Sequence, residues 1–150
     1  MPLILIVEDN GESRYMLEVL LRGNGYEVVS AENGKEALEI ALATPPALIV
    51  SDIFMPVMDG FTLCKEWKKD TTLRLIPFVF YTATYTDPKD IDLGLSLGAA
   101  RFLIKPLEPD LLLKTINDVL AENATGIPDD TVRPSEDEMQ ILKQYNEALF

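Results

Sequence analysis

The 150-residue sequence contains no histidine and a single cysteine, Cys64. Without histidine there is no Ser-His or Cys-His catalytic pair, and one cysteine forms neither a disulfide framework nor a zinc cluster. Basic residues are also scarce, because 13 lysines and arginines face 25 acidic residues, for a net charge of -12. Nucleic acids and anionic membranes require a basic face, so we expect neither as a direct partner. The excess of acid does suit a cation site.

Long apolar runs are missing as well. The run from Leu3 to Val7 is too short for a signal peptide and has no basic residue before it. No stretch reaches the roughly 20 apolar residues of a membrane span. We therefore expect a cytoplasmic protein with one domain and a surplus of chain that forms an appendage.

Short apolar runs alternate with helical patterns along most of the chain. Strands are predicted at 3–7, 26–31, 47–52, 77–82 and 101–105, and helices at 12–21, 33–44, 60–69, 87–98 and 110–120. This alternation at short spacing predicts an α/β fold, doubly wound around a five-stranded parallel sheet with right-handed crossovers. The run at 47–52 is apolar enough to be a central strand that is buried on both faces.

The C-terminal part of the chain changes in composition. We assign residues 1–121 to the main domain and 122–134, rich in Asp, Thr, Gly and Pro, to a linker. Ser135 and Glu138 then form a capping box for an amphipathic helix over 135–150. An isolated helix of this length is marginal in water. It must pack on the domain, pair with a second copy in a homodimer, or continue as a connector into a further domain.

Polar side chains gather at the C-terminal ends of four predicted strands. They are Glu8 and Asp9 after the first strand, Asp52 after the third, Thr82 after the fourth and Lys105 after the fifth. Open α/β sheets bind their ligands at this edge. Three carboxylates in one crevice repel one another unless a cation joins them, and oxygen ligands suit Mg²⁺. With a lysine and a hydroxyl added, the set is equipped for phosphoryl transfer.

Each of these residues also has an ordinary structural interpretation. Taken singly, an aspartate would be a turn or cap residue, Thr82 a strand end and Lys105 a solvated charge. Their joint occurrence at the expected strand ends favours a functional site. For Cys64 the ordinary interpretation is favoured, because no second thiol or cluster of basic neighbours supports a redox sensor.

Six short motifs fall on the predicted elements in a consistent order. They are Val7-Glu8-Asp9-Asn10, Ser51-Asp52, Met55-Pro56-Val57-Met58-Asp59-Gly60, Tyr81-Thr82-Ala83, Leu97-Gly98-Ala99 and Lys105-Pro106. Together they resemble the receiver domain of two-component response regulators, the family of chemotaxis-regulator-like receivers. The resemblance covers about residues 3–120 and implies a flavodoxin-like fold with strand order 2-1-3-4-5.

The resemblance also implies the chemistry of the site. Asp52 would accept a phosphoryl group from a phosphohistidine, forming an acyl phosphate. The phosphodonor would be a sensor histidine kinase or a phosphotransfer protein. Mg²⁺ would be bound by Asp9, Asp52, the Phe54 carbonyl and, through water, Glu8, which stands where the family often has aspartate.

The resemblance also implies which residues contact the phosphoryl group, change on activation or influence its hydrolysis. Lys105 would pair with the phosphoryl oxygens, and its bond to Pro106 would be cis. Thr82 would move to hydrogen-bond the phosphoryl group beside the Ala83 N–H. Phe102 matches the aromatic position that turns inward on activation, although it lacks the hydroxyl of the tyrosine that many members have. Phe54 also stands at a position that, in this family, influences how fast the acyl phosphate hydrolyses, as does Thr84.

Three functions compete. The leading hypothesis is a phosphoacceptor signalling domain that catalyses only its own phosphorylation and dephosphorylation. The alternative is a receiver-shaped docking module that works without phosphorylation, against which the complete set of site residues speaks. A Mg²⁺-dependent aspartyl-phosphate hydrolase is disfavoured because Asp52-Ile53-Phe54 lacks the second aspartate needed as a general acid. No helix-turn-helix or basic patch follows, so a DNA-binding output would lie beyond Phe150.

Overall fold

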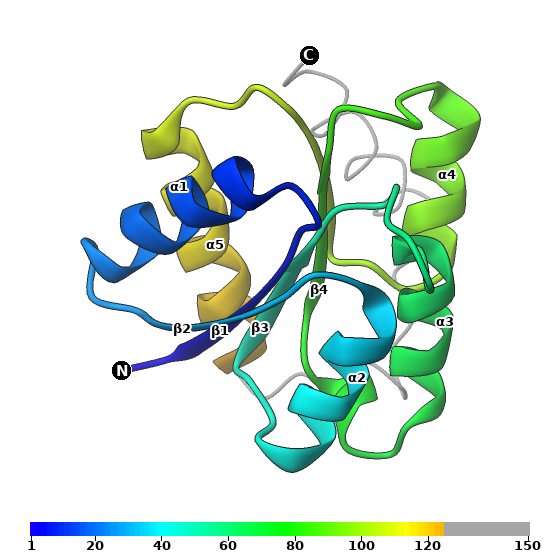
Figure 1. Ribbon diagram of the computed structural model, residues 1–150, viewed down its shortest axis with the longest axis horizontal. Coiled ribbons are helices and arrows are strands. Elements are labelled where there is room, and N and C mark those ends of the chain that lie inside the picture. Colours follow the sequence, from blue (N-terminus) through cyan, green and yellow to red (C-terminus); the bar gives the residue numbers. More distant parts are fainter. Residues whose placement is uncertain (125–150) are drawn as a thin grey trace.

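The computed structural model describes residues 1–124, which form one five-stranded sheet covered by helices on both faces (Figure 1). The strands are β1 (Leu3–Val7), β2 (Glu27–Ala31), β3 (Leu48–Ser51), β4 (Phe78–Thr82) and β5 (Arg101–Ile104). The helices are α1 (Gly11–Arg22), α2 (Gly34–Ala43), α3 (Gly60–Lys69), α4 (Pro88–Ser96) and α5 (Pro109–Ala124), with a short 3₁₀ helix at Leu73–Leu75. All strand pairs are parallel and the order is β2-β1-β3-β4-β5, which confirms the flavodoxin-like α/β prediction.

Two apolar cores separate the sheet from its helices. Helices α1 and α5 cover one face, and α2, α3 and α4 cover the other (Figure 1). Successive side chains along a strand point to opposite faces of the sheet, so each strand contributes to both cores. In β4, Phe78 and Phe80 point toward α3 and α4. Val79 and Tyr81 point toward α1 and α5. Every residue of β3 and β4 is buried, as expected for central strands of a parallel sheet.

Helix starts are fixed by side-chain caps at the edge of the sheet where the strands end. The Asn10 side chain accepts from the Ser13 N–H at 2.9 Å and starts α1 directly after the acidic residues. Asp59 accepts from the Thr62 N–H at 2.8 Å and starts α3. The next residue must be glycine, because a Cβ at Gly60 would lie 2.2 Å from the backbone oxygen of Asp52. The loop after β3 therefore packs tightly beneath the site.

Helix α5 corrects the expected boundary of the linker. It includes Ala124, the last residue that the structure describes, so residues 122–124 are helical and not part of a linker. The sequence Ala-Glu-Asn-Ala at 121–124 contains no helix breaker. The Glu122 carboxylate also accepts from the Arg101 guanidinium at 2.7 Å, which ties the last turn to β5. The rest of the predicted linker and the predicted helix over 135–150 lie outside the described residues.

None of the helices within residues 1–124 is both long and apolar enough to cross a lipid bilayer. Cys64 and Trp67 of α3 are fully buried in the core beneath the sheet. The Trp67 indole N–H donates to the Ile76 carbonyl at 3.1 Å. The burial of Cys64 agrees with its interpretation as a structural residue.

Candidate functional site

The sheet brings the predicted site residues to one edge. Glu8 and Asp9 follow β1, Asp52 follows β3, Thr82 ends β4 and Lys105 follows β5. Backbone hydrogen bonds continue the strand pairing into the site, since the Asp52 N–H donates to the Val7 carbonyl and the Lys105 N–H to the Thr82 carbonyl, both at 2.9 Å. The backbone of the site is therefore held by the hydrogen bonds of the sheet.

Three carboxylates form an acidic cluster. One carboxylate oxygen from each of Glu8, Asp9 and Asp52 lies within 4.8 Å of the others. Asp9 is exposed, whereas Glu8 is only 2% exposed. Burial raises the pKa of Glu8, the hydrogen bond from Lys105 opposes that rise, and the charge of Asp52 adds to it. An oxygen-rich cluster with excess negative charge fits a hard divalent cation such as Mg²⁺.

Lys105 joins two of these carboxylates. Its ammonium donates to Glu8 and, at 3.1 Å, to the Oδ2 atom of Asp52. Burial alone would lower the pKa of Lys105, but the hydrogen bonds and charges of the two carboxylates outweigh it and raise the pKa. The lysine is therefore a cation at neutral pH. Its peptide bond to Pro106 is cis.

Asp52 is held at both carboxylate oxygens. Its Oδ1 atom accepts from the Ile53 N–H at 2.6 Å, and Oδ2 accepts from Lys105. The side chain is partly exposed, with Lys105 on one side. A carboxylate fixed in orientation next to a cation is suited to attack an electrophilic centre that arrives from solvent.

The Thr82 hydroxyl is engaged with its own loop. It donates to the Thr84 carbonyl at 3.0 Å, accepts from the Thr84 N–H at 3.1 Å, and lies 3.1 Å from the Thr84 hydroxyl. Within residues 1–124 no hydrogen bond joins Thr82 to the acidic cluster. The structure thus brings the threonine to the right edge but in a conformation turned toward the β4–α4 loop.

The structure places two more of the predicted residues, Phe102 in the core and Phe54 on the surface. Phe102 lies inside the core, fully buried, with its ring 5.6 Å from that of Phe80. The Phe54 side chain is 65% exposed at the rim of the site. The metal-binding carbonyl of Phe54 and the phosphoryl-contacting N–H of Ala83 stay predictions.

Two residues near the site escaped the sequence reasoning. Arg14 of α1 donates to the Glu8 carbonyl at 2.9 Å and pairs with Glu32 at 3.4 Å, which tethers the start of α1 to the acidic loop. Tyr85 lies in the β4–α4 loop with a positive φ of 55°. Neither has a local signal, because Glu32 and the rings that contact Tyr85 come from other segments of the fold.

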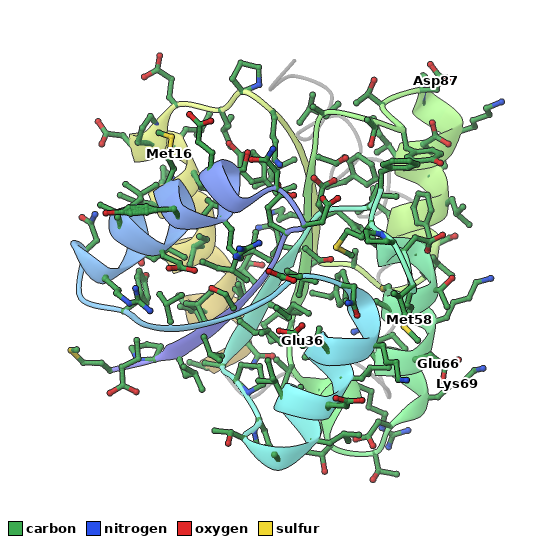
Figure 2. The ribbon with its side chains drawn as sticks, in the orientation of Figure 1. Met16, Glu36, Met58, Glu66, Lys69 and Asp87 are labelled. Atoms are coloured by element: carbon green, nitrogen blue, oxygen red, sulfur yellow. The ribbon has the colours of Figure 1, made fainter. Side chains whose placement is uncertain are left out.

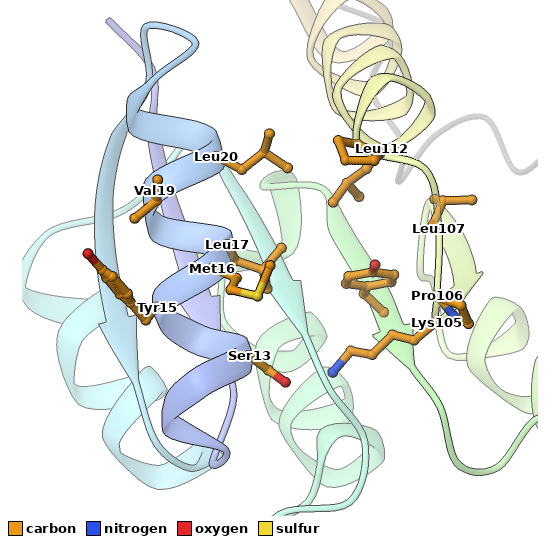
Figure 3. Close-up of a pocket in the computed structure, with 12 residues that line it drawn as sticks. Ser13, Tyr15, Met16, Leu17, Val19, Leu20, Lys105, Pro106, Leu107 and Leu112 are labelled. Carbon is orange, nitrogen blue, oxygen red and sulfur yellow. The ribbon is translucent and has the colours of Figure 1, made fainter.

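An apolar groove opens beside Lys105, between α1 and the start of α5 (Figure 3). It encloses about 700 Å³. Its lining includes Met16, Leu20, Tyr81, Pro106, Leu107 and Leu112. Met16 is 67% exposed, and Figure 2 shows it on α1 beside the start of α5. An exposed apolar surface next to the site is suited to contact with a second protein.

Comparison with known proteins agrees with this geometry. The family model described as "Response regulator receiver domain" matches residues 4–117. Protein PilH of Pseudomonas aeruginosa is 37% identical over 121 residues, which cover 81% of this chain and 99% of PilH. The probable transcriptional regulator ycf27 of Porphyridium aerugineum is 38% identical over 117 residues, which cover 78% of this chain but 47% of that protein. This chain thus spans about half the length of the ycf27 relatives that it matches.

Solved structures point the same way. The receiver domain of a signal transduction histidine kinase from Syntrophus aciditrophicus is 36% identical and superposes with a TM-score of 0.75 over 81% of this chain and 92% of that one. The family match spans the sheet and all five residues of the strand-end cluster. The chain belongs to the response regulator receiver domain family.

Proposed function

We propose that this chain is a phosphoacceptor domain in which Asp52 accepts a phosphoryl group from the phosphohistidine of a sensor histidine kinase or a phosphotransfer protein. The observation that carries the proposal is the convergence of Lys105 and three carboxylates at one edge of the sheet. The family match supports it, because receiver domains are signalling modules.

The chemistry is a transfer between two nucleophiles. A carboxylate oxygen of Asp52 attacks phosphorus, the P–N bond of the donor breaks, and its electron pair stays on the imidazole nitrogen. The product is an acyl phosphate on Asp52. Lys105 is already within hydrogen-bonding distance of the nucleophile and neutralises part of the negative charge that the incoming phosphoryl group adds.

Glu8, Asp9, Asp52 and the Phe54 carbonyl are the residues that would hold Mg²⁺. When bound, the ion supplies positive charge opposite the phosphoryl oxygens. Glu8 would contact the ion through water, because its carboxylate is already hydrogen-bonded by Lys105 and by the Asn10 N–H at 3.3 Å. Asp9 is exposed and would be free to bind the ion directly.

The groove beside Lys105 supports a protein as the phosphodonor. Tyr15, Met16 and Val19 form an exposed apolar stripe on α1, because Val19 follows Met16 by three residues and Tyr15 by four. Amphipathic helices bind to such surfaces through their apolar faces. The same groove would serve the alternative function, a docking module that works without phosphorylation, so binding of a partner alone does not separate the two.

A downstream module in the same polypeptide is part of the proposal. The ycf27 relatives continue well beyond the region that matches this chain. The prediction from composition, a linker over 122–134 followed by a helix over 135–150, is compatible with such a module, as it is with a helix that packs on the domain or pairs with a second copy.

The test is the intact mass of the protein after incubation with Mg²⁺ and acetyl phosphate. We expect one phosphoryl adduct that requires Mg²⁺, is absent from Asp52→Asn, and persists in the control Asp118→Asn. Asp118 lies on the exposed side of α5, where it pairs with Lys114 at 2.8 Å, and it is not part of the acidic cluster. No adduct on the wild-type protein would favour the docking module.

A further inference from the structure

The inward position of Phe102 is built into the packing of this chain. The ring is fully buried and lies 5.6 Å from Phe80. Helix α4 makes room for it with a glycine, since a Cβ at Gly94 would lie 2.7 Å from the Cδ2 atom of Phe102. The side chain also has no hydroxyl that would draw it toward solvent. Phe102 is therefore packed as a core residue in this structure.

The β4–α4 loop holds the Thr82 hydroxyl. The Thr82 hydroxyl makes its hydrogen bonds to the backbone and side chain of Thr84. It reaches a phosphoryl group on Asp52 only after it leaves Thr84. The hydrogen bonds to Thr84 thus compete with a bond between Thr82 and the phosphoryl group, and whatever stabilises these hydrogen bonds opposes that bond.

Tyr85 lies in the same loop, directly after Thr84. Its φ of 55° is unfavourable for a side chain with a Cβ, so its conformation persists only where other contacts enforce it. Those contacts are aromatic. The Tyr85 ring lies 6.4 Å from the ring of Phe54 in the β3–α3 loop and 6.0 Å, edge to face, from that of Phe61 in α3. Phe61 in turn packs edge to face on Phe80 at 5.5 Å, which anchors the contact to the core.

We propose that Tyr85 is a positioning residue for Thr82. The contacts of its ring with Phe54 and Phe61 hold the loop where Thr82 is bonded to Thr84, and engagement of a phosphoryl group requires Tyr85 to leave them while Phe102 stays in place. The inference rests on the proposed phosphorylation of Asp52. It predicts that removing the ring shifts the population toward the engaged loop and strengthens binding of a phosphoryl group.

The test uses beryllium trifluoride with Mg²⁺, a tetrahedral mimic of a phosphoryl group on a carboxylate, titrated calorimetrically into the full chain. Tyr85→Ala removes the ring but keeps the Cβ and therefore the strained φ. We expect it to bind the mimic about tenfold more tightly than wild type, the factor that corresponds to loss of two aromatic contacts from the resting state. Tyr85→Phe keeps the ring and should bind as wild type does.

A second variant guards against a folding defect. Phe54→Ala removes one of the two ring contacts from an exposed position, so it should fold normally and bind the mimic a few-fold more tightly. Wild-type or weaker binding by both alanine variants would overturn the proposal. Failure of wild type and all variants to bind the mimic would instead refute phosphorylation at Asp52.

The position of Phe102 has its own readout. In the wild-type complex with the mimic, the nuclear Overhauser contact between the Phe102 ring and the Gly94 α-protons should persist. Disappearance of this contact on binding would contradict the part of the proposal that keeps Phe102 in place.

Discussion

Removal of Lys105 is the perturbation whose energy follows most directly from the structure. Lys105→Met keeps the length of the side chain and deletes the charge that joins Glu8 to Asp52. Glu8 would then be a buried carboxylate beside two others, with no cation in contact. Breaking a fully buried ion pair costs about 3–5 kcal/mol. The Lys105 side chain is 20% exposed, and Glu8 has the option of taking up a proton, so we reduce this to about 2 kcal/mol.

Urea denaturation at neutral pH measures this cost, with and without Mg²⁺. The variant should lose about 2 kcal/mol of unfolding free energy without the ion. Millimolar Mg²⁺ should reduce the difference in unfolding free energy between variant and wild type to less than about 1 kcal/mol. In the variant the ion replaces the charge of Lys105 and does not have to compete with the lysine for the carboxylates. The matched control is Lys69→Met, whose surface pair with Glu66 is worth at most about 0.5 kcal/mol (Figure 2). A variant as stable as wild type, or a gap that Mg²⁺ leaves unchanged, would refute the account of the acidic cluster.

Three further predictions follow from individual side chains. Burial raises the pKa of Glu8 above its ordinary value of 4.5, so protons compete with Mg²⁺ at higher pH than for an exposed glutamate. Calorimetry should show that the Mg²⁺ affinity decreases as the pH is lowered, starting above pH 4.5. Glu8→Gln should weaken Mg²⁺ binding and make the affinity depend less on pH. The same pH dependence in the variant and in wild type would contradict this. Burial raises the pKa of Cys64 to about 12, so the thiol of the folded protein should resist iodoacetamide at pH about 8. It should react once urea unfolds the chain. Rapid alkylation of the folded protein would contradict the burial of Cys64. Val57 is 77% exposed and has a φ of 69°, which is strained for a β-branched residue. Val57→Gly should raise the free energy of unfolding by about 0.5–1 kcal/mol in urea titrations, and a loss of stability would mean that the valine side chain makes a contact that outweighs the strain.

The parts of the fold that depend on local pattern were predictable. Most strands of the sheet are short apolar runs, and helices α1, α2 and α3 carry start signals at Asn10, Asn33 and Asp59. The order of the strands came from the resemblance of motifs to a family. Because carboxyl ends of parallel strands share one edge, placing Asp52 and Lys105 on strand ends was enough to predict that they meet.

What escaped prediction depends on contacts between distant segments. The three-residue extension of α5 into the expected linker is stabilised by the Arg101–Glu122 pair, which composition alone does not reveal. The turn of Thr82 toward Thr84 is a choice among rotamers and loop conformations that a single threonine in the sequence leaves open. Tyr85 gains its significance only from rings supplied by another loop and another helix.

The most direct test of the central claim is to locate the phosphoryl group chemically. After incubation with Mg²⁺ and acetyl phosphate, borohydride reduces an aspartyl phosphate to homoserine, which peptide mass spectrometry finds by position. The account predicts homoserine at residue 52 alone, in a reaction that requires Mg²⁺. Homoserine at Asp9 or Asp59, or at no position while Mg²⁺ binds normally, would contradict it.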